Sequence, residues 1–96
     1  MPRIDEHCRE SERLFGRAYP EVHQWLDEYA GAPGIGMRHR SKRHHLAGIE
    51  ECVRLFGEDA REVARQHIVS DLRTEGWTGS DPFPKNEAHY RRMGLF

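Results

Sequence analysis

The sequence predicts an all-α protein, a compact bundle of about four helices followed by a loop-rich C-terminal tail. Apolar residues recur at the three- and four-residue spacing of an amphipathic helix along most of the chain. Glycine and proline stand between these periodic segments, where helices begin or end. No segment alternates apolar and polar residues with the period of two that indicates a strand.

Length and composition predict a single helical domain over residues 1–96. A chain of 96 residues can form one modest core. Only 36% of the residues are hydrophobic and 32% are charged, so a bound metal or a homodimer would help to stabilise the fold. The net charge of −1 argues against a general polyanion binder, and nucleic-acid affinity would need a local basic patch.

The sequence also predicts a cytoplasmic protein. Cys8 and Cys52 lie far apart and outside any CxxC spacing, which favours reduced, buried thiols. No stretch approaches the roughly 18 apolar residues of a membrane span. The N-terminal residues lack the apolar core of a signal peptide. We therefore expect no membrane partner.

The first two helices are expected over residues 4–15 and from Pro20 onward. Gly16 ends the first helix, and proline is favoured in the first turn of the second. A loop rich in glycine and proline follows over residues 30–36. The apolar face of the first helix is formed by Ile4, Cys8 and Phe15, and that of the second by Val22, Trp25, Leu26 and Tyr29.

The third helix is expected over residues 38–56, and the fourth from Glu58 or Asp59 to Thr74. Gly57 separates them, in the position typical of a C-terminal glycine. The tail is expected to contain one short helix over residues 86–93. The inward side chains are Leu46, Ile49, Val53 and Phe56 in the third helix, and Ala60, Val63, Ala64, Ile68 and Leu72 in the fourth.

Seven histidines are unusual in so short a chain. On the fourth helix His67 and Asp71 lie one turn apart on the inward face. Burying them without partners would cost several kcal/mol. Either the two side chains form a structural hydrogen-bonded pair, or the HxxxD spacing presents both to one metal ion. His7 and His89, near the chain ends, are expected to be exposed.

A continuous third helix would turn His39 inward and His45 to the edge of the apolar stripe, with Arg40 and His44 on the opposite side. An error of one residue in helix phase would exchange His44 and His45. Imidazole and carboxylate together favour a divalent transition metal, zinc first, with manganese, iron or nickel as alternatives. The expected metal ligands are His23, which forms a second HxxxD with Asp27, and His39, His45, His67 and Asp71.

Basic residues near the start of the third helix predict an adjoining anion site. Arg40, Arg43 and His44 would form it, because guanidinium groups and a helix N-terminus both attract anions. A phosphate-containing ligand or a nucleic-acid backbone would fit. The alternative is a solvated face with salt bridges to acidic neighbours.

Two functional hypotheses follow. The first is a small metal-binding protein with an adjoining phosphate site; if it is an enzyme, phosphoester hydrolysis suits a metal beside arginines. The second is a non-enzymatic binding module whose RHRSKRHH face docks on nucleic acid or an acidic partner protein. The sequence contains no HD dipeptide, HExxH, GxSxG, P-loop or paired CxxC, which disfavours standard hydrolase and zinc-finger sites.

Four segments carry a resemblance to a known pattern: VHQWLD, RHRSKRHHLAGI, LFG and QHIVSDL. They resemble blocks of a small uncharacterised family of bacterial and phage proteins. The resemblance covers residues 22–84, implies no activity, and leaves the N-terminal helix and the ending HYRRMGLF outside the pattern. The residues that it places in the shared pattern are His23, His39, Arg40, Arg43, His44, His45, His67 and Asp71.

Overall fold

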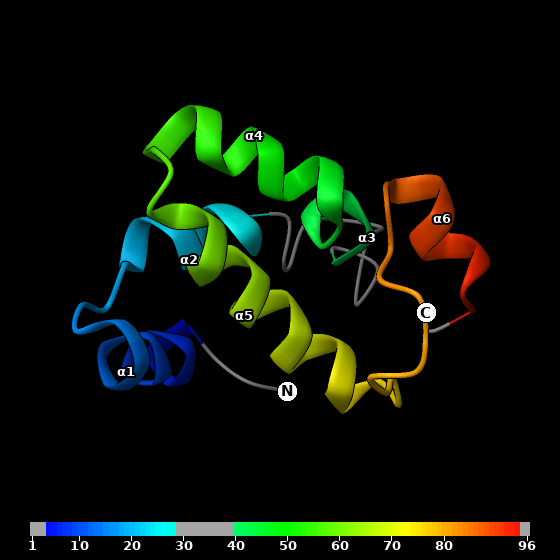
Figure 1. The fold of residues 1–96 in the computed structure, drawn as a ribbon, viewed down its shortest axis with the longest axis horizontal. Helices are drawn as coiled ribbons and strands as arrows, with labels where there is room; N and C mark the ends of the chain where they lie inside the picture. Colours follow the sequence, from blue (N-terminus) through cyan, green and yellow to red (C-terminus); the bar gives the residue numbers. More distant parts are fainter. Residues whose placement is uncertain (1–3, 29–39, 95–96) are drawn as a thin grey trace.

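Every regular element of the described chain is an α-helix (Figure 1). The structure, a computed structural model, describes residues 4–28 and 40–94. This confirms the predicted all-α class. No helix in these two ranges is long and apolar enough to span a membrane. The helices are α1 (Ile4–Phe15), α2 (Pro20–Leu26), α3 (Arg40–Arg43), α4 (Leu46–Phe56), α5 (Ala60–Thr74) and α6 (Glu87–Arg92).

Helix α5 is the central element, and α1, α2 and α4 all pack against it. In Figure 1, α1 and α6 lie at opposite ends of the molecule with α5 between them. The short helix α3 contacts both α4 and α6. Side chains from distant parts of the sequence therefore meet on the surface of α5.

The apolar core lies between α2, α4 and α5 and is closed by the tail. The five inward positions expected in α5 are all buried, which confirms the phase of that helix. Both cysteines are free thiols. The buried apolar residues are Val22, Leu26, Ile49, Cys52, Ala60, Val63, Ala64, Ile68, Leu72, Trp77 and Tyr90.

Helix α1 turns a polar face inward. Its buried residues are His7 and Ser11, whereas Ile4 and Phe15, expected to mark the inward face, are 36% and 38% exposed. The expected apolar face is therefore wrong. The physical reason is the neighbour of α1: this helix packs beside a group of buried histidines, described below, and the hydroxyl of Ser11 hydrogen-bonds to one of them.

The single helix expected over residues 38–56 is interrupted. His45 has an extended backbone, with φ −161° and ψ 174°, and forms the N-cap of α4. Its Nδ1 accepts a hydrogen bond of 2.9 Å from the backbone N–H of Gly48. The first backbone N–H groups of a helix have no carbonyl partner within the helix, and the side chain of an N-cap residue accepts a hydrogen bond from one of them. The chain thus ends one helix at Arg43 and begins another at Leu46.

The C-terminal tail completes this helix start. The backbone N–H groups of Leu46 and Ala47 donate to the carbonyls of Pro84 and Lys85, both at 3.0 Å. The interruption also rotates α4 relative to the expected stripe. Ile49 and Cys52 are buried, whereas Leu46 and Phe56, both expected inward, are exposed.

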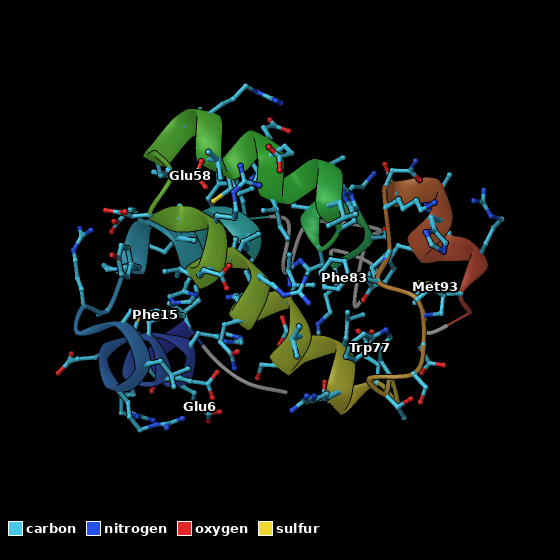
Figure 2. The ribbon with its side chains drawn as sticks, in the orientation of Figure 1. Glu6, Phe15, Glu58, Trp77, Phe83 and Met93 are labelled. Carbon is cyan, nitrogen blue, oxygen red and sulfur yellow. The ribbon has the colours of Figure 1, made fainter. Side chains whose placement is uncertain are left out.

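The loop-rich tail packs on the far end of α5. The indole N–H of Trp77 donates to the carbonyl of Pro82 at 3.1 Å, and the ring of Trp77 meets that of Phe83 edge-on. Figure 2 shows Trp77, Phe83 and Met93 in the half of the molecule that holds α6, away from Phe15 and Glu58. The predicted short helix in the tail is confirmed as α6.

The close approach of α3 and α4 predicts that Gly48→Ala destabilises the protein. A Cβ at Gly48 would overlap the backbone carbonyl of Arg43. We expect a loss of about 2 kcal/mol or more in the free energy of unfolding, measured by urea denaturation. Gly79→Ala is the matched control, because a Cβ there meets nothing within 4 Å, and its effect should stay within about 0.5 kcal/mol. Equal stability of the two variants would contradict this account of the interruption.

Candidate metal centre

Six ionisable side chains from four parts of the fold converge beside α5. They comprise four histidines and two aspartates, and each of the histidines is at most 3% exposed. The two aspartates are also buried, with side chains 2% and 7% exposed. We call this group the His/Asp cluster. Its members are His7 from α1, His23 from α2 and Asp27 just after it, His44 from the α3–α4 link, and His67 and Asp71 from α5.

Asp71 lies at the centre of the cluster. Its Oδ1 is 3.3 Å from His7 Nε2. Its Oδ2 is 2.9 Å from His44 Nε2 and 3.3 Å from His67 Nε2. Because α5 places His67 and Asp71 four residues apart, the two side chains are neighbours on one face. Three imidazoles from three elements thus meet one carboxylate.

His67 faces different groups with its two ring nitrogens. Nε2 lies 3.2 Å from Asp27 Oδ1 and 3.3 Å from Asp71 Oδ2. Nδ1 lies 2.8 Å from Nδ1 of His23, whose Nε2 is 2.7 Å from the hydroxyl of Ser11. The ring of His7 stacks on that of His67, with centroids 3.7 Å apart. His67 therefore links the carboxylates to the remaining imidazoles.

Burial and hydrogen bonding set the charges of these groups in opposite directions. Burial lowers the pKa of His23 to about 3, with a further contribution from His67, and lowers that of His44 to about 4. Burial also opposes charge on His67, but its hydrogen bonds to Asp27 and Asp71 outweigh this and raise its pKa. For Asp71, hydrogen bonds from His44 and His67 outweigh burial and hold the pKa below its usual range.

A second ionic layer surrounds the cluster. Arg40 is 1% exposed, and its guanidinium donates to Glu75 Oε1 at 2.6 Å and lies 3.5 Å from Asp71 Oδ1. The hydroxyl of Tyr90 donates to the other Glu75 oxygen at 2.7 Å. The charged side chains described in this region are thus three carboxylates, of Asp27, Asp71 and Glu75, the guanidinium of Arg40 and, where its raised pKa keeps it protonated, the imidazolium of His67. A cation in the cluster would offset the excess negative charge.

The donor set fits a transition-metal ion. One ligand atom from each of His7, Asp27, His67 and Asp71 lies within 4.8 Å of the others, so these residues could hold an ion. Zinc bonds of about 2.1 Å in tetrahedral geometry separate neighbouring ligand atoms by about 3.4 Å. The contacts of His67 Nε2 with the carboxylates, at 3.2 and 3.3 Å, are close to that separation.

Two buried polar atoms of these residues lack a hydrogen bond within the described chain. His7 Nε2 and Asp71 Oδ1 are buried, and neither forms a hydrogen bond with any described part of the protein. They face each other at 3.3 Å. Buried polar atoms are normally satisfied, and a metal ion is one reason for an exception.

The structure brings together three of the five expected metal ligands, His23, His67 and Asp71. His45 lies elsewhere, because its Nδ1 caps α4 and its Nε2 contacts the carbonyl of Lys42 at 3.1 Å. His39 lies outside the described residues. The cluster adds His7, Asp27 and His44.

Two orientation predictions are wrong. Arg40 and His44, expected to face outward, are 1% and 0% exposed, because the interruption before α4 changes the helix phase. His7, expected to be exposed, is buried against His67. Asp27 could have been predicted as a cluster member from the sequence, because His23 and Asp27 repeat the HxxxD spacing of His67 and Asp71. For His7 the signal was weaker: Ser11 lies one turn away on the same face.

The side chains expected to bind an anion already contact other groups. Arg43 donates to the carbonyl of Trp25 at 2.7 Å, pairs with Glu28 at 3.1 Å and stacks over the Trp25 ring. Lys42 pairs with Glu87 at 3.2 Å. Arg43 and Lys42 are therefore already paired within the described chain.

Comparison with known families assigns the chain to one of them. A family model described as Domain of unknown function (DUF6915) matches residues 3–80. The chain belongs to this family. The match begins before α1, so the expectation that the N-terminal helix departs from the family pattern is wrong, and it spans all six cluster residues. Comparisons with curated proteins and with solved structures gave no match.

The capping role of His45 predicts a stability effect without a metal effect. His45→Ala should lower the free energy of unfolding by about 1 kcal/mol, because the N–H of Gly48 loses its acceptor. His45→Asn, which can cap a helix, should retain most of the stability. Urea denaturation measures both variants, and elemental analysis should find their metal content equal to that of the wild type. Loss of metal from either variant would contradict the separate role of His45.

The lowered pKa values of His23 and His44 predict acid sensitivity of the metal-free protein. Both imidazoles are neutral when folded and take up protons near pH 6.5 when unfolded. Stability should therefore fall as the pH is lowered from 6.5 towards 4, by up to about 1.4 kcal/mol per pH unit for each histidine. His67 adds nothing in this window, because its raised pKa leaves it protonated in both states.

Urea denaturation in chelator at pH 6.5, 5.5 and 4.5 measures this dependence. His44→Gln should reduce the slope by one proton, whereas His89→Ala, far from the cluster in α6, should leave it unchanged. A flat profile for the wild type would contradict the neutral state of the two buried imidazoles.

Proposed function

We propose that this protein binds a divalent transition-metal ion, zinc first, inside the His/Asp cluster. The ligands are His7, Asp27, His67 and Asp71. One observation carries the proposal: one ligand atom from each of four buried residues lies within 4.8 Å of the others, and two polar atoms of these residues, His7 Nε2 and Asp71 Oδ1, have no hydrogen bond among the described residues. Imidazole nitrogen and carboxylate oxygen are ligands that zinc accepts in closed four-coordinate sites.

Charge supports a divalent ion. With neutral imidazoles, two carboxylates of the cluster remain after Arg40 and Glu75 pair with each other. One divalent cation balances Asp27 and Asp71. A proton on His67 balances only one of them, and it leaves His7 Nε2 and Asp71 Oδ1 without hydrogen bonds.

The ion would join helices that share little apolar contact. His7 belongs to α1, Asp27 follows α2, and His67 and Asp71 belong to α5. Helix α1 contributes only His7 and Ser11 to the buried interior. Metal binding would therefore contribute to folding, and removal of the ion would release α1 first.

The proposal is limited to metal binding and does not extend to phosphoester hydrolysis. Arg40 and Arg43, expected to hold a phosphate, contact Glu75 and Glu28. His44, the third expected member of that site, contacts Asp71. These carboxylates would compete with an anion for the same donors.

Zinc removal provides the test. Tag-free protein purified without chelator should contain metal in elemental analysis, and chelation should lower its melting temperature. Added zinc should restore it, because a ligand present at 100 times its dissociation constant stabilises the folded state by about 2.7 kcal/mol. Manganese, iron and nickel salts are compared in the same assay. A metal-free protein whose melting ignores chelator and all four ions would overturn the proposal.

Asp71→Asn tests the assignment of the site. It preserves shape but removes a charged ligand, so zinc affinity should fall by more than roughly tenfold. Asp5→Asn is the matched control, since Asp5 is exposed on α1 and pairs only weakly with Arg9 at 3.6 Å. Equal zinc affinity in the two variants would place the ion outside the cluster.

A further inference from the structure

The His/Asp cluster offers a second group of ligands on the other side of His67. Nitrogens of His7, His23 and His67 also lie within 4.8 Å of one another, and all three residues are buried. This group contains no carboxylate. It shares His7 and His67 with the first group, which is completed by Asp27 and Asp71.

We propose that the cluster holds two metal ions, with the imidazole of His67 as the bridge between them. This inference rests on the proposed function, because it adds an ion to the same cluster. Nε2 of His67 would bind the ion beside Asp27 and Asp71. Nδ1 of His67 would bind the second ion together with His23, and the stacked ring of His7 lies within reach of both.

The proposal rests on the two ring nitrogens of His67, which contact different groups on opposite sides of the ring. Nε2 is 3.2 Å from Asp27, whereas Nδ1 is 2.8 Å from Nδ1 of His23. The two Nδ1 atoms face each other, so one of them donates a proton and the other accepts it. An ion in place of that proton would bind both lone pairs after a small separation of the rings.

Ser11 is a positioning residue for this second ion. Its hydroxyl lies 2.7 Å from Nε2 of His23 and is 2% exposed. This contact fixes the ring so that Nδ1 points to His67. Metal-binding histidines commonly use the second nitrogen for such an orienting hydrogen bond.

Protons and charge define the order of binding. In the metal-free protein a protonated His67 holds one proton on each ring nitrogen; the first ion would displace the Nε2 proton to solvent and leave the other proton on Nδ1. The second ion displaces it to solvent, so one proton is released and His67 becomes an imidazolate. The first divalent ion already balances Asp27 and Asp71, so the second should bind more weakly. Its all-imidazole ligands suit zinc and copper.

Native mass spectrometry of the full chain, titrated from the metal-free state with zinc to saturation, tests the inference. The wild type should bind two ions in successive steps, the second more weakly than the first. His23→Gln should bind one ion, as should Asp27→Asn, and His89→Ala should still bind two. Binding of only one ion by the wild type would overturn the second position while leaving the proposed function intact, and binding of none would overturn both.

Copper tests the bridge itself without a variant. The electron paramagnetic resonance signal of the wild type should grow with the first equivalent of Cu²⁺ and fall short of doubling with the second, because a bridging imidazolate couples the two spins. A second equivalent that adds a full uncoupled signal would overturn the bridge. Two zinc ions retained by folded His23→Gln would likewise show that the second ion lies elsewhere.

Discussion

The buried carboxylate of Asp71 is the constraint on which the arrangement of the helices depends. A desolvated carboxylate without partners costs several kcal/mol, so donors or cations must surround it. Four elements supply them: His7 from α1, His67 from α5 itself, Arg40 from α3, and His44 from the link to α4. The interruption between α3 and α4 is part of this solution, because it turns both Arg40 and His44 towards Asp71.

This constraint gives the molecule two centres of different character. Apolar residues of α2, α4 and α5 form a conventional core. Beside it lies a polar centre of similar depth, against which α1 packs with His7 and Ser11. A chain of this length buries a limited apolar area, so hydrogen bonds or a metal ion must provide much of the adhesion of α1.

The sequence predicts those parts of the fold that follow from one uninterrupted helical phase. Helix α5 is such a part, and its apolar face, together with His67 and Asp71, lies where periodicity places it. The segment around His45 is not, because a side-chain cap restarts the helix and turns Leu46 and Phe56 outward. His7 was missed for another reason: apolar periodicity identifies an inward face only where the neighbour is apolar, and the neighbour of α1 is His67.

The negative charge of the polar centre can be balanced in two ways, by a proton or by a metal ion. The two ways differ in how they use Nε2 of His7 and Oδ1 of Asp71. A proton on His67 satisfies Asp27 and one oxygen of Asp71, and hydrogen bonds to these two carboxylates raise the pKa of His67. Nε2 of His7 lies 3.3 Å from the other oxygen of Asp71, a contact that is long for a hydrogen bond. A metal ion would use both atoms as ligands. Under the proposed function, the contact between His7 and Asp71 is the point at which the ion would join α1 to α5.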